Sequence, residues 1–423
     1  MSIALISLVS LLIVVLISCF LPYNVGMLAL AFSFIVGILI GGMKVSEVIA
    51  GFPSGLFIIL LGVTYLFGIA QNNGTLDRLC GTCIKLVKGK ASLVPFAFFI
   101  LGFILSAIGP GPIPVVALLA PPAMSVASKL KINPFLMAIL CINGANAACM
   151  SPITPSGAIA ASIIQSAGMP DISSQLFFNS AIANVIINVI AYILFGGLKL
   201  IKNDFGKGST DVSDADMGDE IAHLQSLKYE YKHFLTLIGI GVMLVGALVF
   251  KFDVGLLGIF VGTVLIILKC ADEKEVLLKG IPWGALMMIC GISVLVGLMG
   301  KTGGMDMFID MIASISTPNS LTFVATFIPG LISAYSSSIG VVLPTFLPLI
   351  PGLVEQVGGD LVSVFSGVCL GSFIVDASPL STLGALTVGA ATIEMDKRKL
   401  FNQLMAWGLS MCLIGAVLAW LIF

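Results

Sequence analysis

The chain contains two similar stretches that each break an apolar helix. Residues 151–158 read SPITPSGA, and residues 378–385 read SPLSTLGA. Proline removes a backbone donor and clashes with the preceding turn, so each stretch is expected to interrupt its helix. Both stretches lie within long uncharged segments, and unwound backbone at membrane depth survives only inside protein or beside a wet cavity. Two such breaks, one in each half of a chain, indicate the binding site of a membrane transporter.

The composition also indicates a polytopic membrane protein. Of the 423 residues, 58% are hydrophobic and 10% are charged, and the mean hydropathy is +1.15. Soluble domains do not have this balance. The net charge of -1 offers no basic surface for nucleic acid. Since the sequence has no phosphate-binding loop and no nucleophile–histidine–acid set, we expect neither an enzyme nor an ATP-driven pump.

Apolar stretches divide residues 1–198 into the elements of a first structural repeat. A membrane-spanning helix needs about 20 apolar residues. The uncharged segment 91–128 has a Gly-Pro-Gly-Pro turn near its middle and is predicted to be a re-entrant hairpin. Residues 132–170 are predicted to be the broken helix. The other predicted elements are spans over 1–20, 24–42, 54–71 and 173–197, a surface piece over 44–52 and an interfacial helix over 74–90.

A polar linker, residues 199–233, separates this half from a second half, residues 234–423. The linker is rich in carboxylates and is expected to carry no chemistry. His223 and His233 lie in or beside it and are expected to be solvated. The second half is predicted to contain spans over 234–250, 254–268, 283–300 and 400–423, a surface piece over 271–280, an interfacial helix over 303–315, a hairpin over 320–354 and a broken helix over 361–392.

Residues in register indicate that the second half duplicates the first. Six small, turn-forming or acidic residues recur at a constant offset of 229 positions, and the two breaks match at an offset of 227. Such self-similarity is the sequence signature of an internal repeat. The matching pairs are Pro53 and Pro282, Gly55 and Gly284, Gly62 and Gly291, Gly68 and Gly297, Gly74 and Gly303, and Asp77 and Asp306.

The predicted elements also give a topology. Each half has five full crossings, and an odd number of crossings inverts the second half relative to the first. With this arrangement 17 of the 20 Lys and Arg residues fall on one face, and Lys44, Lys251 and Lys301 fall on the other. The crowded face is therefore predicted to be cytoplasmic, with both termini outside the cell and the linker inside.

At the predicted centre, two hairpin tips and two helix breaks offer polar groups without any Lys, Arg or His. Helix N-termini carry partial positive charge and free N–H groups, so four of them around one cavity are suited to a small anion. The candidate substrate-binding residues are Pro110, Gly111, Pro112, Ser151, Thr154, Ser156, Ser337, Ser338, Ser378, Ser381 and Thr382. The candidate ion-coupling residues are Asn143, Asn146, Ser336, Ser372 and Asp376, with a Na⁺ site expected near Asn146 and Asp376.

Asp376 is the one carboxylate inside a predicted membrane segment. An Asp at mid-membrane costs roughly 2.5–3.5 kcal/mol on insertion scales, which favours a Na⁺ ligand or a proton carrier over a structural cap on the second half-helix. Cys80 and Cys83 form a C-x-x-C pair. Because no second pair or nearby histidine completes a metal site, an incidental pair on a helix is the favoured interpretation.

Residues 42–75 resemble the N-terminal domain of MatC-type dicarboxylate (malonate) carriers, which belong to the ion transporter superfamily. The resemblance is carried by GMK at 42–44, AGFPS at 50–54 and VTYLFGIAQNNGT at 63–75. It implies an elevator-type carrier of small dicarboxylates that forms a homodimer. Related sodium–dicarboxylate carriers show a Ser-Asn-Thr triplet at each hairpin tip, whereas here the tips read Gly-Pro-Gly-Pro and Ser-Ser-Ser.

Physical constraints favour Na⁺ as the coupling ion, and no other cofactor is expected. A dianion that enters a negative cell is opposed by about 2.3 kcal/mol per charge per 100 mV, so several cations must travel with it, and one Asp376 cannot carry three protons. A cation/proton antiporter or an inorganic-anion carrier that uses Asp376 remains an alternative. A membrane subunit that transports nothing is a further one, although it leaves the paired helix breaks unexplained.

Overall fold

The computed structural model describes residues 2–21, 23–79, 91–206, 227–250, 252–392 and 394–423, and these residues form helices and no strands. Six of the described segments are long and apolar enough to cross a membrane, and several shorter apolar helices accompany them. The prediction of an all-α membrane protein is therefore confirmed. The six segments are Ser54–Asn72, Ser173–Leu194, Trp283–Thr302, Ser338–Val357, Leu361–Gly389 and Lys397–Ile422.

In the first half the helices follow the order predicted from the sequence. The predicted interfacial helix is helical over residues 75–79, and its remainder, with Cys80 and Cys83, lies outside the described residues. The helices are α1 Ile3–Phe20, α2 Val25–Ser33 with its π-helical extension Phe34–Ile40, α3 Val45–Ile49, α4 Ser54–Asn72, α6 Val94–Ala107, α7 Pro112–Lys129, α8 Pro134–Ala147, α9 Pro155–Ser166, α10 Ser173–Leu194 and α11 Gly197–Gly206.

The second half repeats this order, with an irregular second arm in its hairpin. Prolines at 344, 348 and 351 remove successive backbone donors, so this arm passes through π, α and 3₁₀ turns. The elements are α13 Tyr231–Leu248, α14 Val254–Ile267, α15 Glu273–Glu275, the π turn η4 Val276–Gly280, α16 Trp283–Thr302, α17 Gly304–Ala313, α18 Leu321–Ser333, η5 Ser338–Val342, α19 Leu343–Phe346, η6 Leu347–Leu349, α20 Ile350–Val357, α21 Leu361–Ile374, η7 Val375–Ala377, α22 Thr382–Gly389 and α23 Lys397–Ile422.

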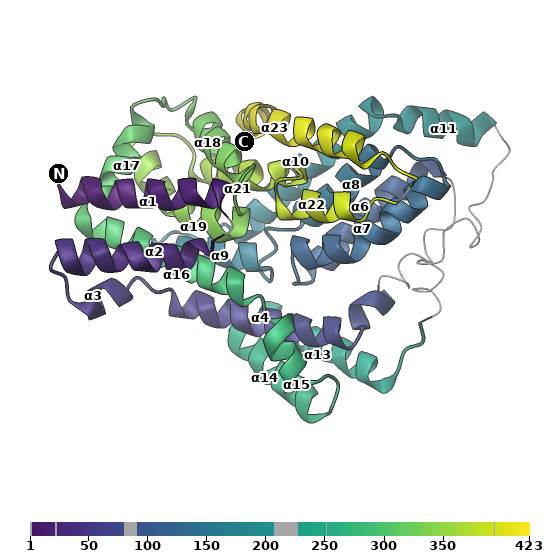
Figure 1. The fold of residues 1–423 in the computed structure, drawn as a ribbon, viewed down its shortest axis with the longest axis horizontal. Helices are drawn as coiled ribbons and strands as arrows, with labels where there is room; N and C mark the ends of the chain where they lie inside the picture. Colours follow the sequence, from purple (N-terminus) through teal and green to yellow (C-terminus); the bar gives the residue numbers. More distant parts are fainter. Residues whose placement is uncertain (1, 22, 80–90, 207–226, 251, 393) are drawn as a thin grey trace.

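Two groups of helices can be distinguished by their contacts (Figure 1). The first bundle consists of α1, α2, α4, α13, α14 and α16, in which α4 packs on α14 and α2 packs on α16. The hairpin bundle consists of both hairpins, both broken helices, α10 and α23, with α6 packed on α8 and α18 packed on α21. The bundles meet where α4 contacts α9 and where α16 contacts η5 and α19. Hairpin tips and helix breaks therefore lie at or near the boundary between the bundles.

The centre of the hairpin bundle is formed by the first halves of the two broken helices. Residues 135–147 of α8 and residues 363–374 of α21 are all buried. Helices that are hydrophobic all round are expected in such positions. Each of these helices ends at a break, so the polar side chains next to the breaks are held in a densely packed core.

Glycines allow the helices of the first bundle to approach closely. A Cβ atom added at Gly62 would lie 1.9 Å from the carbonyl oxygen of Gly255, and one added at Gly291 would lie 2.2 Å from that of Gly26. Small residues at helix crossings are typical of membrane proteins. The two contacts are related by an offset of 229, since Gly26 corresponds to Gly255 and Gly62 to Gly291.

A second pair of glycine contacts follows the same offset. A Cβ added at Gly68 would lie 3.0 Å from Cα of Gly280, and one added at Gly297 would lie 3.1 Å from Cα of Gly51. Gly51 corresponds to Gly280 at the offset of 229. The surface piece of each half is thereby packed against the third span of the other half.

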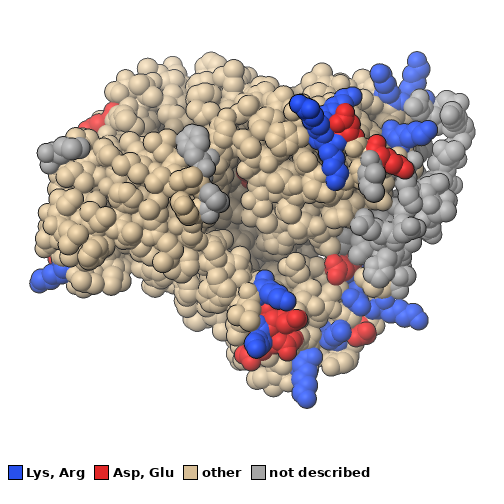
Figure 2. Space-filling model, in the orientation of Figure 1, with Lys and Arg blue, Asp and Glu red and all other residues tan. Residues whose placement is uncertain are grey.

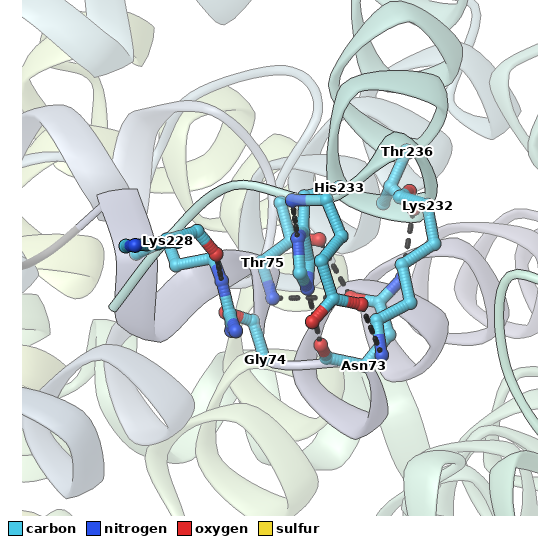
Figure 3. A network of polar contacts seen from close by, with 9 residues as sticks. Asn73, Gly74, Thr75, Lys228, Lys232, His233 and Thr236 are labelled. Atoms are coloured by element: carbon cyan, nitrogen blue, oxygen red, sulfur yellow. Dashed lines mark hydrogen bonds and ion pairs between the residues drawn. The ribbon is translucent and has the colours of Figure 1, made fainter.

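Polar contacts join the end of α4 to the beginning of α13 (Figure 3). Asn73 donates from Nδ2 to Thr236 Oγ1 at 2.8 Å, and the Asn73 carbonyl lies 3.0 Å from Nε2 of His233. His233 is fully buried, and its Nδ1 accepts from the Glu230 amide at 2.8 Å. A hydrogen bond from Lys232 lowers the pKa of the Glu230 carboxyl.

The joint corrects an expectation about the linker. His233 was expected to be solvated, and it is buried because it packs into the turn that follows α4. At the two ends of the predicted linker over 199–233, α11 extends to Gly206 and α13 begins at Tyr231. A charged composition indicated solvent exposure, but contacts with a distant helix outweigh that local signal. His223 lies outside the described residues.

Charged side chains gather on part of the visible surface. Figure 2 shows most of them at the right-hand end and over α15, with wide uncharged areas between and few charged side chains at the left-hand edge. Large apolar side chains are exposed on many helices, among them Leu16 at 57%, Ile267 at 72% and Leu421 at 68%. An exposed apolar surface of this kind is expected for helices that face lipid.

We predict that Gly62→Ala lowers the thermal stability of the purified protein in detergent, because the added methyl group meets the backbone of α14. Overpacking of this kind costs about 1–3 kcal/mol. Gly241→Ala in α13 is the control, since a Cβ there has nothing within 4 Å. Equal melting temperatures for both variants would contradict the assigned crossing.

Candidate functional site

Two adjoining hollows lie where the hairpin tips meet the helix breaks. The larger hollow, about 240 Å³, lies between the first hairpin tip, the second tip, α4 and α16. The smaller hollow, about 30 Å³, lies between both tips and the second break. They share Pro112, Ile113, Ser337 and Ile339 as lining residues. We treat them together as the central cavity.

Four helix N-termini contribute residues to the central cavity. Pro112 begins α7 and lines both hollows, while Pro155 begins α9 and lines the larger one. Ser338 begins η5 and Thr382 begins α22, and both line the smaller hollow. The positive ends of four helix dipoles are therefore directed to one region of the protein.

The four N-termini differ in how many of their donors remain available. Thr154 caps α9 by accepting from the Gly157 amide at 3.2 Å, and Ser337 caps η5 by accepting from the Gly340 amide at 2.9 Å. Neither α7 nor α22 receives a side-chain cap. The first N–H groups of a helix have no partner within the helix. In α7 and α22, which contact each other, no amide of the first turn is occupied by a capping side chain.

The hydroxyls of the first break are used to satisfy its own backbone. Thr154 Oγ1 and Ser156 Oγ both donate to the Cys149 carbonyl, the latter at 2.6 Å. Ser151 Oγ donates to the Ala107 carbonyl of the first hairpin at 2.9 Å. None of these three hydroxyl-bearing residues is among the described residues that line the cavity, which differs from the arrangement expected from the sequence.

At the second break, the candidate residues divide between the cavity and the backbone. Ser381 and Thr382 line the smaller hollow, whereas Ser378 is fully buried outside it. At the hairpin tips, Ser336, Ser337 and Ser338 line the smaller hollow. Pro110, Gly111 and Pro112 line the larger one.

Asp376 is held at the cavity by the second hairpin tip. It is 7% exposed and lines the smaller hollow. Ser338 Oγ donates to Asp376 Oδ1 at 2.7 Å, and Ser333 Oγ lies 2.7 Å from Ser338 Oγ. Ser333 and Ser338 also contact the Ser372 carbonyl at 2.7 and 3.0 Å. The carboxylate therefore connects the second break to the hairpin tip through a hydroxyl group.

The first break shows that this backbone geometry does not need a carboxylate. Thr154 Oγ1 donates to the Cys149 carbonyl, and at the offset of 227 Ser381 Oγ donates to the Asp376 carbonyl at 2.5 Å. Cys149 thus occupies in the first half the position that Asp376 occupies in the second. Since the same turn forms around a cysteine, the Asp376 side chain is available for another role.

Two asparagines next to the first break have amide oxygens without hydrogen-bond partners. Asn143 and Asn146 are fully buried on α8, and the Oδ1 atom of each has no partner among the described residues. Asn146 Nδ2 donates to the Phe373 carbonyl at 2.9 Å and so links the two broken helices. Asn143 Nδ2 lies 3.5 Å from Asn188 Oδ1. Buried amide oxygens without donors are suitable ligands for a hard cation.

No cluster of three His, Cys, Asp or Glu residues that could hold a metal occurs among the described residues. The oxygens near the breaks come instead from amides, carbonyls, hydroxyls and the one Asp376 carboxylate. This ligand set suits a weakly held alkali ion. The candidate Ser372 is already bonded, since its hydroxyl donates to the Val368 carbonyl at 2.6 Å and its carbonyl accepts from Ser333 and Ser338.

Several residues of the cavity were not predicted from the sequence. Lys279 and Gln71 line the larger hollow, and Phe373 lines the smaller one. Lys279 belongs to a surface piece, and Gln71 stands at the end of α4, so neither position suggested a cavity. The offset of 229 gave no signal for them, because it relates one surface piece to the other, whereas the contact of Gly280 with Gly68 of α4 is seen only in the structure.

We predict that Ser338→Ala destabilises the protein by about 1–3 kcal/mol, because it removes a donor from a buried carboxylate. In an Asp376→Ala background the same change should cost much less, since coupled pairs are not additive. Thermal unfolding in detergent measures both effects. Ser410→Ala, at an exposed position of α23, is the control. Equal losses in both backgrounds would show that the two side chains do not interact.

Comparisons with known proteins agree with this description. Residues 1–149 match the family model described as the N-terminus of the dicarboxylate carrier protein MatC. No curated protein matches the chain. A similar solved structure is that of MtrF from Neisseria gonorrhoeae, described with a class of antimetabolite efflux pumps. The alignment covers 99% of this chain and 94% of the MtrF chain, with 14% sequence identity and a TM-score of 0.55. At this identity the similarity supports the fold alone. The resemblance to MatC-type dicarboxylate carriers is therefore confirmed over residues 1–149 of the 423.

Proposed function

We propose that the protein is a secondary transporter of a small dicarboxylate, such as malonate or a C4 dicarboxylate like succinate. The observation that carries this proposal is the convergence of four helix N-termini on one cavity beside Asp376. The match of residues 1–149 to a dicarboxylate carrier family supports the substrate class. A protein that only transported cations would have little use for so many donors and dipole ends at its centre.

In the proposed bound state, a carboxylate of the substrate lies between the N-termini of α7 and α22. Because neither helix has a side-chain cap, their first N–H groups can donate to an anion. α7 begins Pro-Ile-Pro, so its first turn offers the Ile113 amide, whereas α22 offers the amides of Thr382, Leu383 and Gly384. α22 is therefore the main anion-binding helix.

Na⁺ is the proposed coupling ion. A substrate carboxylate at α22 would lie beside Asp376, and two anions in a poorly solvated cavity repel each other unless a cation accompanies them. The partnerless oxygens of Asn143 and Asn146 and the carbonyls next to the breaks are candidate ligands. At least two Na⁺ ions per dianion would cancel the cost of entering a negative cell, and a third would let the membrane potential drive uptake.

The proposed mechanism is an elevator movement of two inverted repeats. The paired glycine contacts at the offset of 229 support the repeat, as does the joint between Asn73 and Thr236, which matches a 2.8 Å contact between Thr302 and Ser7. In this proposal the first bundle stays fixed as part of a homodimer, and the hairpin bundle carries the cavity across the membrane.

The proposed location is the inner, cytoplasmic membrane of the cell. The bias of Lys and Arg places both termini outside and residues 199–233 inside. This orientation directs Lys279 and the end of α4 towards the cytoplasm.

A cation/proton antiporter is the second candidate function, and the buried Asp376 carboxylate favours it. We predict that Asp376→Asn separates the two functions. In a dicarboxylate carrier the variant should keep substrate uptake with altered Na⁺ dependence, because the substrate is held by helix amides. In an antiporter the same variant should lose all cation exchange.

The direct test is uptake of labelled malonate into proteoliposomes, with and without an inward Na⁺ gradient. We predict Na⁺-dependent accumulation that succinate and other short dicarboxylates compete with. Loading the vesicles with unlabelled malonate distinguishes net uptake from exchange. Absence of uptake under both Na⁺ and proton gradients would refute the proposed substrate class.

A further inference from the structure

Among the described residues that line the larger hollow, Lys279 is the only charged one. It lies in η4, next to Gly280, where an added Cβ would lie 3.0 Å from Cα of Gly68 in α4. This close contact fixes the position of the Lys279 backbone relative to the cavity wall. Its side chain is 79% exposed, so the ammonium group lies at the mouth of the hollow and not at its base.

The ammonium group of Lys279 is only weakly neutralised. Its one ion pair within the described residues is with Glu275, at 3.8 Å between Nζ and Oε1. The other carboxylate oxygen of Glu275 accepts from Asn72 Nδ2 at 2.9 Å. The side chain of Asn72 at the end of α4 therefore holds the Glu275 carboxylate, and an exposed ion pair at this distance is weak because water screens it. Lys279 retains most of its attraction for another anion.

We propose that Lys279 is a positioning residue for the substrate, which attracts the dianion to the cavity mouth, and that Glu275 moderates this attraction. The inference rests on the proposed function. Basic charge at the mouth of a cavity with apolar walls focuses the electric field and raises the local concentration of an anion. Because an ammonium group is a compact, well-hydrated charge, it attracts a carboxylate without demanding a fixed geometry. A dianion held at the mouth can therefore still pass to the N-termini beyond it.

The test compares binding of labelled malonate to purified protein in detergent, which does not depend on membrane sidedness. At low ionic strength, Lys279→Gln should raise the dissociation constant about three- to tenfold. Glu275→Gln should lower it, by about twofold, because it removes the competing carboxylate. Both effects should shrink as ionic strength rises, since salt screens exposed charges.

Lys274→Gln is the matched control. Lys274 is exposed on α15, five residues from Lys279, and is not among the residues that line the larger hollow. The Lys274→Gln variant loses the same charge from the same surface, so its affinity for malonate should equal that of the unchanged protein. An equal loss in Lys274→Gln and Lys279→Gln would indicate a general surface effect and overturn the inference.

The outcomes also separate this inference from the proposed function. If the unchanged protein binds no malonate, the substrate class is wrong. If it binds malonate and Lys279→Gln binds it equally well at low ionic strength, then Lys279 has no positioning role and the inference is wrong. A merely structural role for Lys279 would lower the melting temperature without the opposite effect of Glu275→Gln.

Discussion

The structure depends on the requirement that backbone polar groups at membrane depth find partners inside the protein. An unbroken helix meets this requirement by itself, whereas a broken helix needs additional donors. At both breaks a hydroxyl supplies one, from Thr154 to the Cys149 carbonyl and from Ser381 to the Asp376 carbonyl. Asn146 supplies another to the Phe373 carbonyl across the two broken helices. The breaks therefore stabilise each other within one buried core.

The same requirement explains how an anion site can form without basic residues at its centre. Breaking a helix creates a new N-terminus, and a hairpin tip creates another. Where Thr154 and Ser337 cap the new ends, one amide at each end, that of Gly157 or Gly340, is already bonded. Where no side chain caps the helix, as in α7 and α22, the donors remain for a ligand. The difference between capped and uncapped ends is the basis for the proposal that α7 and α22 bind the anion.

Much of the fold could be predicted from the sequence, because length, apolar composition and proline position determine most elements directly. The roles of single hydroxyl groups could not. Ser151, Thr154 and Ser156 were predicted to bind substrate, yet they bond to backbone carbonyls, because sequence does not reveal whether a serine faces a cavity or a broken turn. Lys279 and His233 were misjudged for a related reason. Each lies in a polar segment of the sequence. Only the packing of these segments against α4 and the turn after it places Lys279 at the cavity and buries His233.

The substrate is proposed to bind at the N-terminus of α22, and protection of a cysteine there from a thiol reagent tests this binding. The experiment uses Thr382→Cys in a chain whose nine native cysteines are replaced and which still takes up malonate. Gln165→Cys, at the far end of α9, is the control. Malonate with Na⁺ is expected to slow labelling at position 382 and to leave the rate of labelling at position 165 unchanged. Acetate is expected to protect neither position. Equal labelling of position 382 with and without malonate would contradict binding at the N-terminus of α22.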